Sequence, residues 1–147
     1  MNKPLFKIHD NLFNEQEIDA LYGSFRDEKP WTFTGAAKDI SGPRKFKNPL
    51  EKEDVYGTMH DFHEDGANDY NQIYTVMFYL NKIWALIYAG ETVFLNKEKT
   101  EIENAVIPKP GRAVIFDGFI THAAREISRS CIELRMVATL KYQRKNV

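Results

Sequence analysis

Two histidines and one aspartate stand where they could bind a single metal ion. His63 and Asp65 are two residues apart, and His122 follows much later in the chain. Residues two apart on a β-strand point to the same face, so the first two side chains would project together, with Cα atoms about 6.6 Å apart. Two imidazoles and one carboxylate are the ligands of a facial Fe(II) site that keeps open coordination positions. These residues therefore indicate metal-dependent chemistry.

The other nearby candidates fit this ligand set less well. His60 falls on the opposite strand face from His63, which leaves His122 as the natural third ligand. Asp61 shares the ligand face, and we interpret it as a supporting or solvent-facing acid, while His9 is treated as structural or exposed. Alternatively, His63 and Asp65 could form a surface pair at a strand end, and His122 could be a loop histidine.

An arginine near the C-terminus could hold an acidic molecule beside the metal. In the strand expected over residues 132–142, one face holds Arg135, Val137, Thr139 and Lys141. An inward arginine is costly unless an anion meets it, and its planar fork suits a carboxylate bidentately. Tyr79, on a strand face of mixed apolar and hydroxyl side chains, could donate its phenol to the same carboxylate.

This arginine assignment has alternatives. Arg135 could instead form a salt bridge with Glu91 or Glu133. Arg125 or Arg129 could then bind the anion in its place.

The elements that must position these residues are one helix and many short strands. Asn14 with Glu17 three residues later is a helix-start signal, and apolar residues then recur at helical spacing. Extended segments are expected at 5–8, 55–63, 73–80, 92–95, 101–106, 113–116 and 132–142. One helix followed by many short strands predicts a mainly β fold, a barrel or a sandwich. A barrel would bring His122 back beside the first two ligands.

Between the helix and these strands, residues 29–54 mix proline and glycine with charges. That composition predicts a loop or poorly paired edge strands. Trp31, Phe33 and Phe46 would pin this stretch to the rest of the protein.

Length and composition favour one soluble domain. The 147 residues, 43% of them hydrophobic, suffice for a single domain over 1–147 with a real core. The 20 basic and 21 acidic residues nearly cancel, so no strong field toward nucleic acid or an anionic membrane is expected. The single cysteine, Cys131, cannot form an internal disulfide and is interpreted as a small buried hydrophobe. Without a leader or a bilayer-length apolar run, we expect a cytoplasmic protein.

Four pieces of the sequence together resemble one protein family. They are His-Glu-Asp at 63–65, Tyr-Thr-Val-Met-Phe-Tyr-Leu-Asn at 74–81 with Trp84, Ala-Gly-Glu-Thr-Val-Phe at 89–94, and 108–116 followed by His122 and Arg135. In this order and spacing they resemble the iron(II)- and 2-oxoglutarate-dependent dioxygenases, in the prolyl-4-hydroxylase-like branch that includes many short bacterial and phage proteins. The resemblance covers roughly residues 55–142.

The resemblance implies a fold, a site and a reaction. The fold would be a double-stranded β-helix, or jelly roll, with the N-terminal helix packed on it. Fe(II) would be bound by His63, Asp65 and His122, and the distal carboxylate of 2-oxoglutarate by Arg135, with supporting hydroxyls from Tyr79 and Thr139. The reaction would use O₂ to hydroxylate a C–H bond and release succinate and CO₂, with ascorbate as a candidate stimulant.

The sequence departs from the family pattern in two places. Ala89 replaces the first glycine of the usual Gly-Gly-Glu-Thr turn, and the stretch before His63 is short, with Tyr56 as a candidate for an expected tyrosine. Substrate-covering loops often lie in that stretch, so the primary substrate stays open, with a slight preference for a peptide or protein side chain. Nucleic acid is not indicated.

The alternative function is a non-catalytic or cupin-like metal-binding barrel that acts as an interaction module. Arg135 discriminates between the two functions, because only the 2-oxoglutarate enzyme needs a cation opposite the metal.

Overall fold

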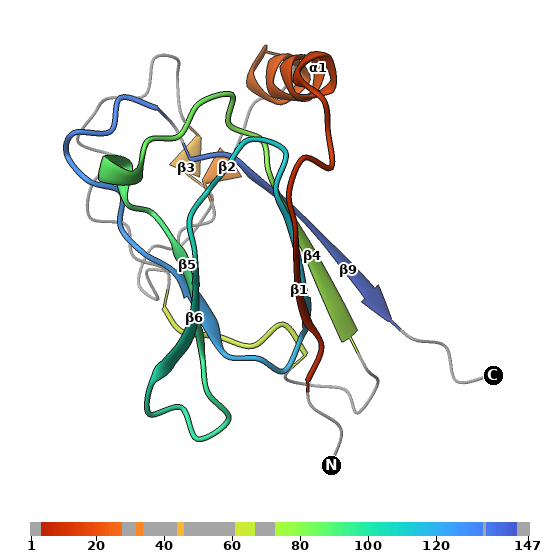
Figure 1. Cartoon of the computed structure of the whole chain (residues 1–147), viewed down its shortest axis with the longest axis vertical. Coiled ribbons are helices and arrows are strands. Elements are labelled where there is room, and N and C mark those ends of the chain that lie inside the picture. The colour runs from red at the N-terminus through yellow and green to blue at the C-terminus, as the bar shows by residue number, and fades with distance from the viewer. Residues whose placement is uncertain are drawn as a thin grey trace.

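The computed structural model describes residues 4–27, 32–33, 44–45, 61–66, 73–133 and 135–143 (Figure 1). The strand expected over 55–63 is therefore described only from residue 61. Tyr56, His60, Trp31, Phe46 and the side chain of Phe33 lie outside the described part of the chain.

Two antiparallel sheets make up most of the described structure, and Figure 1 shows β1, β4 and β9 on one side and β5 and β6 on the other. The larger sheet has the order β1-β7-β4-β9, with strands at Phe6–His9, Ala113–Asp117, Ile73–Tyr79 and Val137–Gln143. The smaller sheet has the order β6-β5-β8, with strands at Ile102–Val106, Thr92–Leu95 and His122–Ala124. Outside them, β2 (Thr32–Phe33) pairs with β3 (Arg44–Lys45), and a 3-10 turn, η2, spans Leu86–Tyr88.

The predicted mainly β class with an N-terminal helix is confirmed. Strand β5 has its predicted bounds, and the bounds of β1, β4, β6 and β7 lie within one residue of the prediction. Two predictions were wrong in detail. Strand β9 begins at Val137 rather than at residue 132, because the Met136 N–H donates to the buried side-chain oxygen of Asn81 at 2.8 Å. Strand β8 was missed, because three residues are too few to show an alternating pattern.

The aromatic core lies between the sheets and directly backs His122. Phe94 of β5 contacts Phe116 of β7 edge to face, with ring centroids 5.0 Å apart. The His122 ring stacks on Phe94 and meets Phe116 at its edge, with centroids 5.8 and 4.7 Å away. Met77 and Tyr79 of β4 are also buried in this cluster. Because interiors are close-packed, these contacts limit how far the His122 ring can move.

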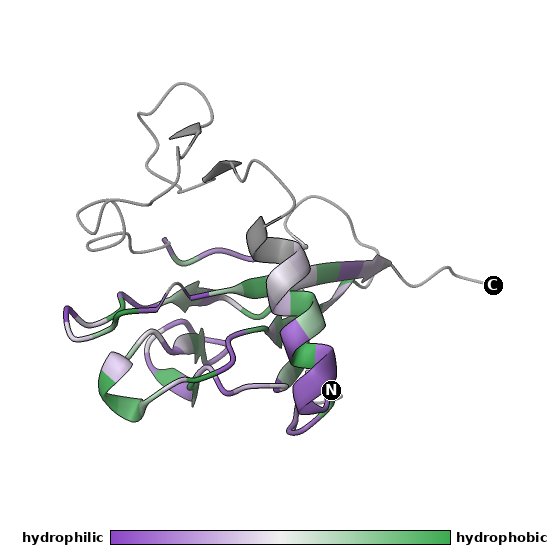
Figure 2. Cartoon of the chain, turned by 90° about the horizontal axis from the view of Figure 1, so that it is seen from above, coloured by the Kyte–Doolittle hydropathy of each residue, from purple (hydrophilic) through white to green (hydrophobic). Residues whose placement is uncertain are grey.

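The helix α1 (Glu15–Asp27) begins where the sequence predicts. The Asn14 N–H donates to the Glu17 carboxylate at 2.8 Å, and the Glu17 N–H donates to the Asn14 side-chain oxygen at 2.9 Å. This reciprocal pair is a capping box, which satisfies two backbone donors that the first turn leaves unpaired. Ile18 is buried, and Figure 2 shows the hydrophilic residues of α1 gathered toward its N-terminal end.

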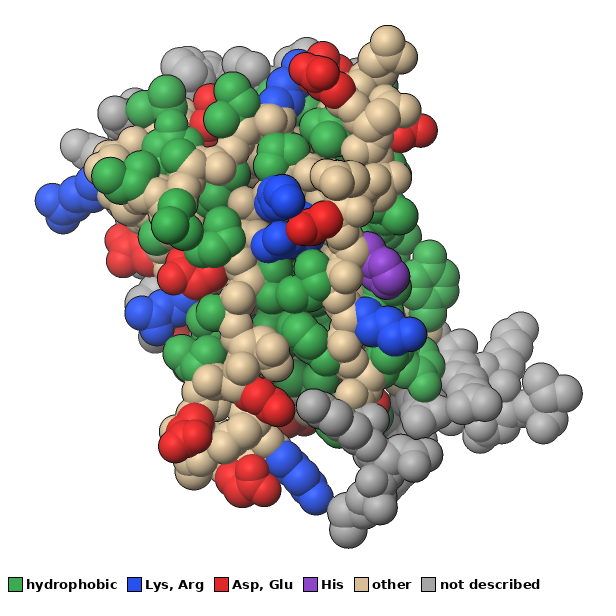
Figure 3. Space-filling model, in the orientation of Figure 1, with side chains coloured by type: hydrophobic (Ala, Val, Ile, Leu, Met, Phe, Trp, Pro, Cys, Tyr) green, Lys and Arg blue, Asp and Glu red, His purple; other side chains and the backbone are tan. Residues whose placement is uncertain are grey.

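Surface charges are mixed in sign on the face that Figure 3 shows, where Lys, Arg, Asp and Glu side chains are scattered among apolar ones. This distribution agrees with the formal net charge of −1. Within the described residues, no helix has the length and apolar character that crossing a membrane requires.

Candidate active site

The three predicted metal ligands meet at one edge of the smaller sheet. His63 forms an isolated antiparallel bridge with His122, the first residue of β8. Each backbone N–H of this pair donates to the carbonyl of the other residue, at 3.0 and 2.9 Å. Asp65 lies two residues on, and its N–H donates to the Gly118 carbonyl at 2.8 Å. The candidate ligand atoms of the three residues all lie within 4.8 Å of one another.

Each imidazole is oriented by a backbone carbonyl two residues earlier. The Nδ1 atom of His63 lies 2.9 Å from the Asp61 carbonyl, and the Nδ1 atom of His122 lies 2.9 Å from the Ile120 carbonyl. A carbonyl can only accept, so Nδ1 carries the proton and Nε2 keeps its lone pair for a metal. Burial lowers the pKa of His122, which favours the neutral imidazole that metal binding needs.

This donor set fits a divalent cation. Both histidine Nε2 atoms lie 3.9 Å from a carboxylate oxygen of Asp65. With metal–ligand bonds of about 2.0–2.2 Å, two ligand atoms on one face of an ion lie roughly 3 Å apart, so shifts of less than about 2 Å would bring the three ligand atoms onto one ion. His122 is buried and His63 is exposed, so the site opens on the His63 side. Two imidazoles and one carboxylate on one face leave coordination positions open for other molecules.

Two side chains of the larger sheet hold the Asp65 carboxylate. Thr75 of β4 donates from Oγ1 to Oδ2 at 2.6 Å, and Lys141 of β9 lies with Nζ 2.8 Å from Oδ1. Although burial acts to raise the pKa of Asp65, the hydrogen bonds from Lys141 and Thr75 hold that pKa below its usual value. The carboxylate is therefore both charged and fixed in orientation.

Glu64 links the two ligand-bearing segments from outside the metal site. Its Oε1 lies 2.7 Å from Lys99 Nζ and accepts a hydrogen bond from Thr121 Oγ1 at 2.9 Å. These two partners lower the pKa of Glu64. Because Glu64 follows His63 and Thr121 precedes His122, this hydrogen bond ties the two histidine segments together.

The sequence interpretation did not identify the supporting roles of Thr75, Lys141, Glu64 and Thr121. Strand alternation does place Thr75 on the same face as Tyr79, and Lys141 on the same face as Thr139. This shared face was the only indication in the sequence that Thr75 and Lys141 could support the site. Their common target depends on the register of β4 with β9, which sets Thr75 opposite Lys141. Alternation along one strand cannot show that register.

A second polar group forms around the predicted anion-binding arginine. Arg135 donates from Nε to the Gly90 carbonyl at 2.8 Å and from Nη2 to Thr92 Oγ1 at 2.7 Å. The Tyr79 hydroxyl lies 2.7 Å from the same Thr92 oxygen, and the guanidinium carbon lies 5.6 Å from the centre of the Tyr79 ring. Burial lowers the pKa of Arg135 and raises the pKa of Tyr79. A charge with restricted access to water is a strong attractor for an anion.

The strand register places this cation beside the metal ligands. Thr92 pairs with Ala124, and Phe94 pairs with His122. Thr92 is thus two residues from Phe94 along β5, which places their Cα atoms about 6.6 Å apart. An extended five-carbon diacid spans on the order of 5 Å between its carboxyl carbons, given C–C bonds of roughly 1.5 Å. The arrangement can therefore accept a dicarboxylate with one end at the metal and the other at the arginine.

Thr139 lies opposite Met77 in the β4–β9 pairing and is exposed. It occupies the strand face between Val137 and Lys141, as the alternation predicts. Its proposed hydroxyl contact with a cosubstrate stays a prediction.

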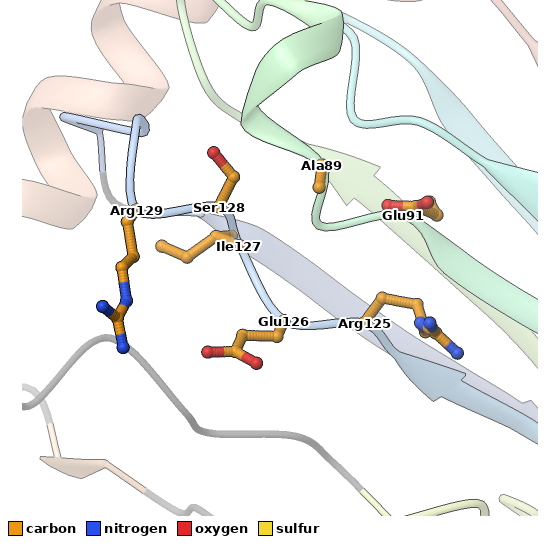
Figure 4. A pocket seen from close by; sticks show the side chains of 7 residues that line it. All are labelled: Ala89, Glu91, Arg125, Glu126, Ile127, Ser128 and Arg129. Atoms are coloured by element: carbon orange, nitrogen blue, oxygen red, sulfur yellow. The ribbon is translucent and has the colours of Figure 1, made fainter.

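The alternative anion binders lie along a separate surface pocket (Figure 4). This pocket is lined by Ala89, Glu91, Arg125, Glu126, Ile127, Ser128 and Arg129. Arg125 and Arg129 are both exposed. Glu91 directly precedes Thr92, and its charge acts to raise the pKa of Arg135. In the part of the chain that the structure describes, Arg135 forms no ion pair with Glu91 or Glu133.

The sequence matches one family model over most of its length. The model of the 2OG-Fe(II) oxygenase superfamily matches residues 51–142. Among curated proteins, none matches the chain significantly.

Two solved structures share the fold. A prolyl-4-hydroxylase from Pseudomonas putida is 14% identical, with a TM-score of 0.65 over 97% of this chain and 93% of its own. A prolyl hydroxylase from Trichoplax adhaerens, solved with a hypoxia inducible factor oxygen degradation domain peptide fragment, is 15% identical, with a TM-score of 0.59 over 94% of this chain and 82% of its own. These likenesses confirm the predicted double-stranded β-helix.

Proposed function

Since the chain belongs to the 2OG-Fe(II) oxygenase superfamily, we propose that it hydroxylates a C–H bond of a peptide or protein side chain. The balanced reaction takes 2-oxoglutarate, O₂ and R–H to succinate, CO₂ and R–OH. The observation that carries the proposal is the ligand cluster of His63, Asp65 and His122, with Arg135 hydrogen-bonded to Thr92, two residues along β5 from the residue that pairs with His122.

The chain's own residues would hold the reactants in place. The Nε2 atoms of His63 and His122 and one oxygen of Asp65 would bind Fe(II), which supplies the activation of O₂. The backbone carbonyls at Nδ1 and the hydroxyl of Thr75 fix these ligands before any reactant arrives. Such fixed ligands reduce the reorganisation that catalysis requires.

Arg135 would bind the distal carboxylate of 2-oxoglutarate. The guanidinium carries five N–H donors, of which Nε and one on Nη2 are used by Gly90 and Thr92. Those two contacts set the direction of the guanidinium group, and the Tyr79 hydroxyl in turn contacts the Thr92 hydroxyl. Thr139, on the exposed part of the same inner face, is the further hydroxyl that we assign to this cosubstrate.

The peptide or protein class of substrate rests on two supports. The fold resembles that of the Trichoplax prolyl hydroxylase, whose structure holds a peptide fragment. The ligand cluster also opens at the exposed His63, where a chain held outside the barrel could present one side chain.

Turnover of 2-oxoglutarate tests the proposal. The purified protein with Fe(II), 2-oxoglutarate and O₂ should release succinate and CO₂ in equal amounts. Release should be slow without a primary substrate and faster with a suitable peptide. Asp65→Ala should abolish both products, because it removes a ligand. Succinate release by Asp65→Ala at the wild-type rate would contradict the proposal.

A matched pair of arginine variants tests the cosubstrate site. Arg135→Met should raise the KM for 2-oxoglutarate by about 30-fold or more, the cost of removing a partly buried charged partner. Arg125→Met, in the surface pocket, should leave this KM unchanged. The reverse result would assign the cosubstrate to Arg125.

A further inference from the structure

Lys141 places a positive charge in direct contact with a metal ligand. Its ammonium lies 2.8 Å from Asp65 Oδ1, while the other carboxylate oxygen is held by Thr75. The Asp65 side chain is only 5% exposed, whereas that of Lys141 is 53% exposed. Lys141 therefore reaches in from the solvent side of the site to a buried carboxylate.

The register of β9 makes this position specific to Lys141. Lys141 lies opposite Thr75, and Thr139 lies opposite Met77. Because side chains alternate along a strand, Lys141 is on the inner face and both its neighbours point outward.

A positive charge at this distance has opposite effects on the two species that the centre must bind, the metal cation and the anionic cosubstrate. It repels a divalent cation placed between the three ligands, and it competes for the charge of Asp65. It attracts a dianion that binds at the same centre. Coulomb energies of this kind remain significant over several ångströms when one partner is shielded from water.

We propose that Lys141 is an electrostatic positioning residue of the metal centre, which weakens its hold on the cation and strengthens its hold on the anionic cosubstrate. This inference rests on the proposed function, because it takes the ligand cluster as the metal site and 2-oxoglutarate as the anion. Lys141 holds the ligand carboxylate in the orientation that Thr75 also favours, and it adds one positive charge.

Binding measurements on Lys141→Met test the inference without any turnover. Mn(II) replaces Fe(II) as a redox-stable probe in isothermal titration calorimetry. The protein is first titrated with Mn(II) alone, and the Mn(II)-saturated protein is then titrated with 2-oxoglutarate. We expect Mn(II) to bind about fivefold tighter and 2-oxoglutarate about fivefold weaker than in the wild type. A merely structural role would weaken both, so the opposite signs are the diagnostic result.

Two further variants complete the design. Lys141→Arg keeps the charge and should return both affinities to near the wild-type values. Lys82→Met removes a lysine from a surface ion pair of the same length, 2.8 Å to Asp19, and should change neither affinity. If Lys141→Met does not fold, Lys141→Gln replaces it, with the same two expectations.

Several outcomes would overturn the inference. Unchanged affinities for Mn(II) and 2-oxoglutarate in Lys141→Met or Lys141→Gln would do so. A loss of both affinities together would do so as well. Failure of the wild type to bind 2-oxoglutarate would contradict the proposed function instead. In that event, tighter Mn(II) binding by Lys141→Met would still support the effect of Lys141 on the metal, and unchanged Mn(II) binding would overturn it.

Discussion

The imidazoles of His63 and His122 are oriented by the same kind of local hydrogen bond. In both, Nδ1 faces the carbonyl of the residue two positions earlier, at 2.9 Å. This contact needs only the local backbone, so it forms with each segment and presets the Nε2 lone pair. The Asp65 carboxylate differs, because its partners come from the other sheet. Its orientation therefore depends on the assembled fold.

Thr75→Val should show what the hydroxyl on Asp65 contributes. The change removes the 2.6 Å hydrogen bond to Oδ2 with little change of volume. Loss of such a support typically weakens metal binding by 10- to 100-fold, and we expect a loss at the lower end of this range, about tenfold, for Mn(II). Titration calorimetry would measure this change.

Thr100→Val is the matched control, since Thr100 is exposed and bonds only to Asn96 among the described contacts. Equal Mn(II) affinities in the Thr75 and Thr100 variants would contradict the role given to Thr75.

Strand alternation predicts which residues share a face but not which residues they meet. It grouped His63 with Asp65, whose ligand atoms do lie close together, and it placed Arg135 with Thr139 and Lys141. It could not predict that Lys141 meets Asp65, because that contact depends on pairing between distant strands. The supports of the site are therefore found only in the folded structure.

At the scale of elements, the turns beside β1 and β7 are joined by an ion pair. Asp10, just after β1, meets Arg112, just before β7, with Arg112 Nε 2.6 Å from its Oδ1. Lys109 adds a second contact at 3.2 Å. The hydrogen bond from Arg112 is the main cause that lowers the pKa of Asp10 to about 2. The pair extends the register in which His9 lies opposite Ala113.

Asp10→Asn should reveal this pair through pH. Because the folded-state pKa is lowered, the stability that Asp10 contributes is present above about pH 4 and is lost as the pH falls toward 2. At pH 6 the variant should be less stable than the wild type by about 1 kcal/mol or less, since the pair is partly exposed. Near pH 2, where Asp10 is about half protonated in the folded state, the difference should be much smaller. Urea denaturation at both pH values would measure it, and a difference independent of pH would contradict this account.

Elements with strong local signals were predicted well. The capping box of α1 lies in four consecutive residues, and β5 combines β-branched and aromatic residues between turns. Strand β8 has three residues, and the start of β9 is set by a contact from Asn81. The sequence around these two elements contains no local pattern that marks their bounds.

At the scale of the whole molecule, the site joins both sheets. His122 belongs to the smaller sheet, while Thr75 and Lys141 belong to the larger one. The order of strands in each sheet could not be predicted from periodicity, because it depends on long-range pairing. The expected double-stranded β-helix came from family resemblance, and the fold comparison confirms it.

A metal ion bound across these segments should stabilise the whole fold. A ligand that binds only the native state adds about 2.7 kcal/mol to the free energy of unfolding at a concentration of 100 times its Kd. We expect this gain for Mn(II) in urea denaturation of the wild type. Asp65→Ala should gain almost nothing at the same concentration. An equal gain in both proteins would mean that Mn(II) binds elsewhere.

The central claim is that one site binds Fe(II) and 2-oxoglutarate together. An anaerobic titration with Fe(II) and then 2-oxoglutarate tests it most directly, through the weak visible charge-transfer band of a chelated keto acid. We predict a band in the wild type, none in His63→Ala, and a shift to higher 2-oxoglutarate concentration in Arg135→Met. Tight Fe(II) binding by the wild type with no band at any 2-oxoglutarate concentration would contradict the claim.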